Sequence, residues 1–357
     1  MANPQRSLRH QRILGLFDQT KGRGLEIGPL FDPVVRRWES DVRYVDVHPG
    51  DVLKEYYSSH PGVPVADIVD PDYSLSSPDG VRTLSETLRG AGRFDWVVAS
   101  HVIEHVPDIV GWLQEVADVL QDDGQVILAV PDRRFSFDAD RDPTTVGEML
   151  LAYYMRDRIP SVRAVYDHYS RAVEIEAADA WRGARPGALD RIHDLDFVRS
   201  QLRLAHDDSA YVDCHVWLFT PQSFVDQLAE LARLDLITFV VDRIVPTAHN
   251  ELEFYALLRR LPREMPASTR SALLTHGFQW HDLDVTGSVE PPGLDVPHPP
   301  VNTPADNATV LSPLEFGLIQ RKRALMSRVR AAAAFVRRRQ DRWTQKIRSR
   351  CRSWRPT

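Results

Sequence analysis

The chain has 357 residues, of which 43% are apolar and 26% are charged. This balance supports one core of about 250 residues with an attached segment, or two smaller domains, and excludes a mini-protein or a disordered chain. Two cysteines, Cys214 and Cys351, are too few for a disulfide framework or a thiolate zinc site. The sequence has no secretory signal and no apolar run of about 18 residues, so we expect a cytoplasmic protein without a transmembrane segment.

The net charge of −6 conceals a strong segregation of charge along the chain. Residues 321–357 contain fourteen Lys or Arg and a single acid, Asp341, so this segment carries +13 and the remainder carries −19. An acidic body and a basic tail interact with different partners, so the total charge of the chain describes neither of them.

Short apolar runs predict five strands in the first part of the chain, at residues 24–28, 42–47, 65–69, 94–100 and 125–130. Between the last two, apolar residues recur at spacings of three and four from Ile109 to Leu120, which predicts an amphipathic helix that ends at Asp122-Asp123-Gly124. Strands that alternate with helices in this way pair in parallel, with helices on both faces of the sheet.

A long polar stretch follows, and it predicts helices near 145–156 and 192–204. Thr220 and Pro221 then predict the start of a helix, because threonine is a good N-cap and proline suits the first helical position. Two final strands are expected at 237–241 and 252–258. Residues 132–219 are therefore predicted to be an insertion within one domain of residues 1–260.

Beyond this domain, residues 261–310 hold eight of the 25 prolines and predict a linker. Residues 311–357 predict one basic helix. Its segment 321–355 suits contact with a protein partner or a membrane surface, or is a solvated appendage, and nucleic acid is less favoured.

A glycine-bearing turn after the first strand and an acid at the end of the second are typical of adenosine-binding sites. Gly28 and Asp46 occupy these positions, although each also suits an ordinary strand end. Pro29 removes a backbone N–H from the turn, and Asp32 adds a carboxylate nearby. Both changes disfavour a dinucleotide, whose pyrophosphate needs amide donors, and favour S-adenosylmethionine, which has no phosphate and a cationic sulfur.

Four motifs together resemble a class I S-adenosylmethionine-dependent methyltransferase: Leu25–Leu30 (LEIGPL), Val45–Asp46, Ser100–Val106 (SHVIEHV) and Gly124–Asp132 (GQVILAVPD). The resemblance covers about residues 21–138 and extends more loosely to residue 260. It implies an α/β fold, a Rossmann-like, doubly wound sheet of seven mostly parallel strands with one antiparallel strand. The glycine-rich first loop of that family is reduced here to Gly28 and Pro29.

The resemblance also implies which residues bind the cofactor. Gly28 would lie under the methionine part, Asp46 on the ribose, and Asp67 or Asp70 near the adenine. The backbone of Ser100 and His101 would lie beside the sulfonium, and Glu26 belongs to the same first motif.

The sequence His101-x-x-Glu104-His105 has the letters of an inverted zinc-peptidase motif. Here it follows a predicted parallel strand rather than lying inside a helix, which argues against a peptidase. Some methyltransferases that act on ribose-type hydroxyls bind a divalent ion through a similar Glu-x-x-Glu-His arrangement. One hypothesis is a metal held by His101, Glu104 and His105, with His168 or His215 as a further ligand. The imidazole of His101 stands in place of the first Glu of that arrangement, which favours zinc, manganese or iron over magnesium. The alternatives for His105 are pocket lining, a base or a substrate contact.

Methyl transfer to an alcohol requires a positioned acceptor and a group that removes its proton. His105, His168 and His215 are the candidate bases, since histidine titrates near neutral pH. In an extended segment Asp213, His215 and Trp217 share one face, which suits a sugar ring, unless the segment is a half-buried strand with a satisfied histidine. We therefore expect an O-methyltransferase acting on a small molecule or glycan. The alternative is a catalytically silent binding module that recruits a partner through its basic tail.

Overall fold

The computed structural model describes residues 6–285, apart from 61, 79, 185–189, 208–209, 263, 267, 271–272 and 274–283. The predicted basic helix at 311–357 and most of the predicted linker at 261–310 lie outside the described residues, so their roles stay predictions. Except for Ser59 and His60, the described residues belong to one of two compact units of the chain. No helix within the described part of the chain combines the length and the apolar content that crossing a membrane requires.

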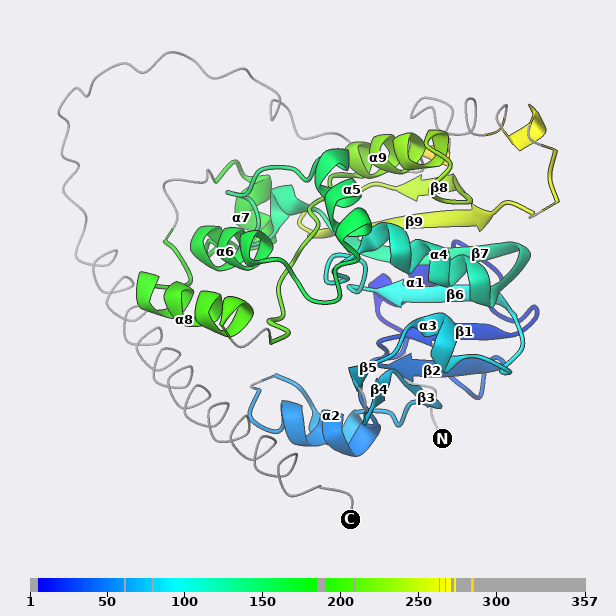
Figure 1. The fold of residues 1–357 in the computed structure, drawn as a ribbon, viewed down its shortest axis with the longest axis horizontal. Helices are drawn as coiled ribbons and strands as arrows, with labels where there is room; N and C mark the ends of the chain where they lie inside the picture. Colours follow the sequence, from blue (N-terminus) through cyan, green and yellow to red (C-terminus); the bar gives the residue numbers. More distant parts are fainter. Residues whose placement is uncertain are drawn as a thin grey trace. The chain divides into compact units, whose positions relative to one another are not determined.

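A single mixed sheet organises the described unit (Figure 1). Its strand order, from one edge to the other, is β3 (Tyr73–Ser74), β2 (Val42–Asp46), β1 (Gly24–Ile27), β6 (Phe94–Ser100), β7 (Leu120–Pro131), β9 (Glu253–Arg260), β8 (Phe239–Val245) and the two-residue β10 (Asp284–Val285). Only β9 runs antiparallel to its neighbours in this sheet. The predicted fold class, a Rossmann-like and mostly parallel seven-stranded sheet, is confirmed, with β10 as a short addition at the edge.

The prediction of a third strand at residues 65–69 is wrong. Residues Val65–Asp67 form a 3-10 helix, η1, and the third strand is β3. The Asp67 N–H donates to the Pro64 carbonyl at 2.8 Å, which closes a turn, and Ile68 is the one fully buried residue of the run. One buried side chain is too little to hold a strand in the sheet, so pairing with β2 passes to Tyr73 and Ser74.

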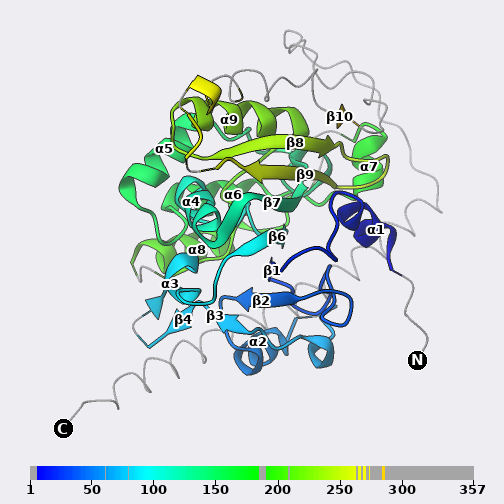
Figure 2. The same ribbon diagram turned by 90° about the vertical axis from the view of Figure 1, so that its right-hand side faces the viewer.

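Helices cover both faces of the sheet. One face carries α3 (Leu84–Thr87), α4 (Ile109–Val119), α5 (Val146–Met155) and α9 (Pro221–Arg233), and the other carries α1 (Leu8–Leu14) (Figure 2). Along β6, Val97 and Ala99 pack toward the first face and Trp96 and Val98 toward the second, as the two-residue period of a strand requires. The helices predicted around 109–120, 145–156 and after Thr220 are confirmed, with Thr220 as the N-cap of α9. The predicted end of the first of them at Asp122-Asp123-Gly124 is wrong, because α4 ends at Val119 and these three residues lie in β7.

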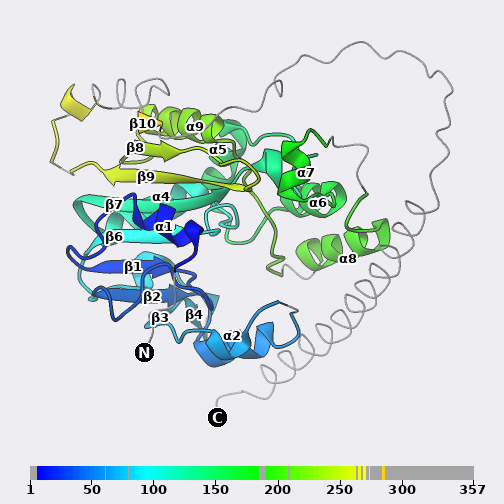
Figure 3. The ribbon, with the colours of Figure 1, turned by 180° about the vertical axis from the view of Figure 1, so that it is seen from behind.

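The predicted insertion has two parts. Helix α5 belongs to the layer on the sheet, whereas α6 (Val162–Arg171), α7 (Ala177–Trp181) and α8 (Leu195–His206) lie beyond the carboxyl ends of the parallel strands (Figures 1 and 3). A further helix, α2 (Gly50–Tyr57), follows β2. Open parallel sheets bind ligands at these carboxyl ends. The insertion therefore adds three helices on the side of the sheet where we expect the site.

The loop after β1 is organised by a buried carboxylate. Glu26 is 2% exposed, and its two carboxylate oxygens accept hydrogen bonds from the backbone N–H groups of Val34 at 2.7 Å and Val35 at 2.9 Å. Burial raises the pKa of Glu26 to about 7, although these two hydrogen bonds act to lower it. Residues 28–41, all of them described, contain no helix. The β1 turn thus lacks the helix N-terminus that a dinucleotide pyrophosphate uses.

The substitution Glu26→Ala should lower the free energy of unfolding by about 2–4 kcal/mol, because it leaves two buried amide N–H groups without acceptors. Urea denaturation of the purified chain measures this change. Glu230 lies exposed on α9, and Glu230→Ala, as the matched control, should change the stability by less than about 0.5 kcal/mol. Equal effects of the two substitutions would contradict the role given to Glu26.

Candidate active site

The turn after β1 depends on glycine at position 28. Gly28 has a φ of 67°, in the left-handed region, and its N–H donates to the Val45 carbonyl at 2.9 Å. A Cβ atom at this position would lie 3.2 Å from Cγ2 of Val102, in the turn after β6. Glycine therefore permits both the backbone conformation and the close approach of the two turns that are expected to hold the cofactor.

Asp46 is the last residue of β2, at the same edge of the sheet. Its Oδ1 accepts a hydrogen bond from the Val47 N–H at 2.7 Å. Burial raises the pKa of Asp46 to about 6, partly offset by backbone hydrogen bonds from Val47 and His48. A carboxylate in this position suits two ribose hydroxyls, and the assignment stays a prediction.

The adenine contact stays open between two acids. Asp67 is exposed on η1, while Asp70 forms an ion pair with Lys54 of α2 at 3.1 Å and its side chain is 75% exposed. Beside Asp46 in the sheet lies Ser74, whose hydroxyl donates to the Val47 carbonyl at 3.1 Å. Sequence reasoning did not identify this serine, because the third strand was placed too early in the chain.

His101 follows β6 with a φ of 54°, an unusual conformation for a residue other than glycine. Its Nε2 lies 2.6 Å from Oε2 of Glu253 on β9, and Glu253 also accepts from Arg9 Nε at 2.7 Å. Although burial opposes ionisation, His101 and Arg9 lower the pKa of Glu253 to about 2. Arg9 of α1 also contacts the hydroxyl of Ser100. This network fixes the turn beside the expected sulfonium, and it uses Arg9 and Glu253, which the sequence analysis did not select.

Three side chains from distant parts of the chain converge next to this turn. One carboxylate oxygen of Glu104 and one ring nitrogen each of His105 and His215 lie within 4.8 Å of one another. Two backbone hydrogen bonds hold the segments together, since the Glu104 carbonyl accepts from Val216 N–H at 2.7 Å and Trp217 N–H at 3.2 Å. The prediction of a group made by His101, Glu104 and His105 needs correction, because Glu253 engages His101 and His215 takes its place.

Each imidazole of this cluster is anchored by a carboxylate. Nδ1 of His105 lies 2.9 Å from Oδ1 of Asp213, and Nδ1 of His215 lies 2.6 Å from Oδ2 of Asp138. Burial acts against a charged His105, but the contact with Asp213 raises its pKa above the usual value. Because carboxylates accept at both Nδ1 atoms, Nδ1 carries the hydrogen in each ring and Nε2 is left for a ligand or substrate.

Asp138 is itself held by a buried ion pair. Arg141, 3% exposed, donates from Nη1 to Oδ1 of Asp138 at 2.7 Å and from Nη2 to the carbonyl of His215 at 2.8 Å. Although burial acts to raise it, His215 and Arg141 hold the pKa of Asp138 below its ordinary value. The orientation of His215 is thus fixed at both its ring and its backbone.

His168 has a supporting place in the cluster. Its Nδ1 accepts a hydrogen bond from the His215 N–H at 3.1 Å, and burial, reinforced by the nearby His215 and Arg141, lowers its pKa to about 3. A neutral imidazole that accepts a backbone hydrogen bond helps to position His215, and a pKa of about 3 makes it a weak base at neutral pH.

The expected sugar-stacking role of Trp217 is wrong. Its side chain is 2% exposed, and its Nε1 donates to the Val106 carbonyl at 2.6 Å. The apolar indole packs into the core because the segment turns this face inward. Aromatic surface near the cluster comes instead from Tyr211, 53% exposed, whose hydroxyl donates to Asp213 at 3.4 Å.

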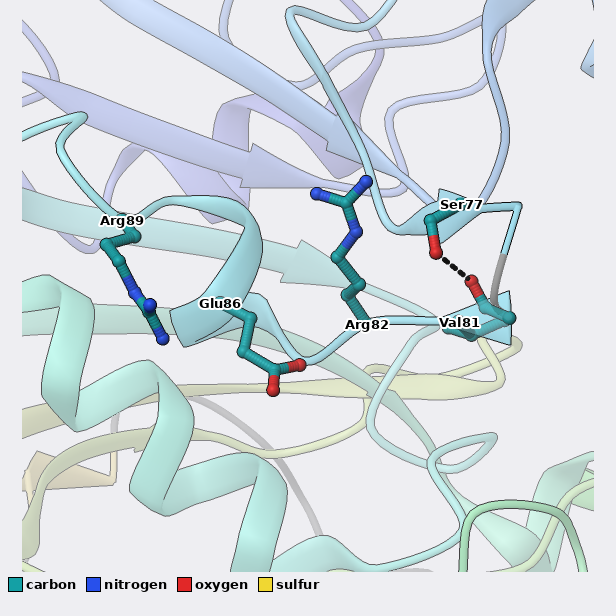
Figure 4. A pocket seen from close by; sticks show the side chains of 6 residues that line it. Ser77, Val81, Arg82, Glu86 and Arg89 are labelled. Atoms are coloured by element: carbon teal, nitrogen blue, oxygen red, sulfur yellow. Dashed lines mark hydrogen bonds between the residues drawn. The ribbon is translucent and has the colours of Figure 1, made fainter.

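A separate surface hollow of about 370 Å³ lies over the hairpin of β4 (Ser76–Ser77) and β5 (Gly80–Val81) and over α3 (Figure 4). Its border includes Arg82, Glu86 and Arg89. Glu86 accepts from the Thr83 N–H at 2.9 Å and thereby caps α3. The hollow shares no lining residue with the candidate site, and we assign it no part in catalysis.

Comparison with known families identifies the class of protein. Residues 7–230 match a family described as a methyltransferase domain. The chain belongs to this family, which confirms the expected class, an S-adenosylmethionine-dependent methyltransferase, and its cofactor. No curated protein matches the chain.

Methyltransferases are among the solved structures that match the chain, and three matches illustrate the level of similarity. An S-adenosylmethionine-dependent methyltransferase from Mesorhizobium loti is 13% identical with a TM-score of 0.35, and the match covers 70% of this chain and 96% of that one. The CcbJ methyltransferase from Streptomyces caelestis is 10% identical with a TM-score of 0.37, covering 71% and 89%. The glycopeptide N-methyltransferase MtfA, complexed with S-adenosylmethionine, is 14% identical with a TM-score of 0.34, covering 71% and 93%. With these low TM-scores, the family assignment rests on the sequence match.

The substitution Asp46→Ala should weaken S-adenosylmethionine binding about thirtyfold, equivalent to about 2 kcal/mol, because the ribose hydroxyls lose a charged acceptor. In the wild type the affinity should fall as the pH is lowered through about 6, where Asp46 becomes protonated, and the variant should lack this dependence. Calorimetric titration between about pH 5 and about pH 8 measures both effects. Asp51→Ala, at an exposed position of α2, is the matched control. An unchanged affinity in Asp46→Ala would place the ribose elsewhere.

Proposed function

We propose that this protein transfers the methyl group of S-adenosylmethionine to a hydroxyl oxygen of a small molecule or glycan. The observation that carries the proposal is the cluster of Glu104, His105 and His215 next to the Ser100–His101 turn. In a class I methyltransferase this turn lies beside the sulfonium, so the cluster adjoins the position of the reacting methyl group.

Oxygen is the acceptor atom that this cluster suits best. A neutral amine attacks a sulfonium methyl group without help, whereas an alcohol must lose its proton as the new bond forms. Both imidazoles present Nε2 and are fixed by a carboxylate at Nδ1, with distances of 2.9 Å for His105 and 2.6 Å for His215. Fixed rings of this kind hold an acceptor hydroxyl in line with the methyl group and stabilise the developing charge.

Groups near the cluster support a polar acceptor with an apolar face. The Asp213 side chain is 60% exposed, and Tyr211 presents a half-exposed ring beside it. The hydroxyl of Tyr169 donates to the Asp213 carbonyl at 2.7 Å, which ties this segment to α6 of the insertion. A carboxylate beside an aromatic ring suits the hydroxyl edge and the apolar face of a sugar or a similar small molecule.

The substitution His215→Ala should reduce methyl transfer at least about a hundredfold, because it removes an imidazole that faces the acceptor. S-adenosylmethionine affinity should stay within about twofold, since His215 has no part in the predicted cofactor contacts. Extracts and purified glycans incubated with isotopically labelled S-adenosylmethionine, followed by mass spectrometry of the products, measure the transfer and locate the methyl group.

His206→Ala is the matched control, because the His206 side chain is 76% exposed on α8; its activity should equal that of the wild type. Transfer of the label to nitrogen or carbon by the wild type, or full activity in His215→Ala, would contradict the proposal.

A further inference from the structure

Glu104 is buried, and its carboxylate accepts no hydrogen bond from the described residues. Its side chain is 1% exposed. The nearest imidazole nitrogens, Nδ1 of His101 and Nε2 of His105, lie 3.7 Å and 3.9 Å from Oε1. A buried carboxylate without hydrogen-bond donors is costly, and burial of this kind is normally compensated by a counter-charge or a coordinated cation.

We infer that Glu104, His105 and His215 form a binding site for a divalent first-row transition metal. The carboxylate oxygen and the two ring nitrogens already lie within 4.8 Å of one another. A carboxylate with two imidazoles suits zinc, manganese, iron or cobalt, whereas magnesium prefers an all-oxygen site. Since the proposed set contains three protein ligands, it leaves room for a water or a substrate oxygen, as catalytic sites do.

The surroundings of the two histidines support this inference independently. Metal-binding histidines usually donate their other ring N–H to a carboxylate, which fixes the tautomer and turns the free nitrogen toward the ion. Asp213 and Asp138 provide this arrangement, at 2.9 Å and 2.6 Å from the respective Nδ1 atoms. Arg141 holds Asp138 in turn. These contacts leave both Nε2 atoms to other ligands, and Nε2 of His105 lies 3.9 Å from Oε1 of Glu104.

The inference deepens the proposed function and assigns two of the expected bases, His105 and His215, to metal binding. A cation at this position would lower the pKa of a bound acceptor hydroxyl, whose proton would pass to solvent water as the oxygen takes the methyl group. The role of His101 is then confined to the network with Glu253 and Arg9.

The test is a titration of the chelator-treated full-length chain with Co²⁺, followed by visible absorption and by elemental analysis after desalting. We expect one equivalent bound to the wild type, His101→Ala and the surface control His206→Ala. Glu104→Gln and His215→Ala should bind at least about a hundredfold more weakly. No stoichiometric binding to the wild type, or undiminished binding to Glu104→Gln and His215→Ala, would overturn the inference.

Three further measurements separate metal binding from folding and from methyl transfer. Asp213→Asn changes a side chain that is 60% exposed, and it should weaken Co²⁺ binding about 10- to 100-fold through His105. Chelation should lower the melting temperature of the wild type but leave that of Glu104→Gln unchanged, and an equal decrease in both would count against the site. S-adenosylmethionine binding, measured on the same samples, reports whether the fold and the cofactor site are intact, so failure of the metal inference is distinguishable from failure of the proposed function.

Discussion

The site depends on the contact between the turn after β6 and the segment that leads into α9. The Glu104 carbonyl accepts backbone hydrogen bonds from Val216 and Trp217, at 2.7 Å and 3.2 Å. The indole of Trp217 adds a third bond between the two segments at the Val106 carbonyl. These bonds join a strand end of the sheet to the end of the insertion, and they bring His105 and His215 to ring centroids 4.7 Å apart. No single segment of the chain contains the cluster, so the cluster depends on this contact.

Several buried charged groups lie near this contact, and most of them are paired. Asp138 is paired with Arg141 and His215, and Glu253 with His101 and Arg9. Such pairs add little to stability compared with apolar packing, but they fix the orientation of the groups they contain. Glu104 differs, since its carboxylate lacks a donor among the described residues. This difference distinguishes a side chain that holds the structure from one that is available to a ligand.

Much of the fold follows from local sequence patterns. The apolar runs of β1, β6 and β7 and the helical spacing of α4 are strong because these elements are buried along most of their length. The strand predicted at 65–69 was wrong because only Ile68 of this segment is fully buried. In such a segment a turn satisfies the backbone hydrogen bonds as well as a strand does. Gly28 and Asp46 could be selected from the sequence because Gly28 directly follows a strand and Asp46 ends one, and their roles in cofactor binding stay predictions.

The cluster was only partly predictable. Glu104 and His105 adjoin a strand end, so their sequence position indicates the site. Whether His215 or His101 joins Glu104 and His105 in the cluster depends on long-range contacts. These are the contact of His101 with Glu253 on β9 and that of His215 with Asp138. Likewise, alternation along 213–217 places Trp217 on one face but does not tell whether that face meets solvent or core. The Thr220 cap, by contrast, was a local signal, and α9 begins there.

A crystal structure of the full-length chain with S-adenosylhomocysteine and zinc tests the central claim most directly. We expect the ribose hydroxyls on Asp46, the sulfur beside the Ser100–His101 turn, and zinc bound to Glu104, His105 and His215 on the side that the methyl group of the cofactor would face. A cofactor bound elsewhere on the sheet, or a sulfur separated from the cluster by packed side chains, would contradict it.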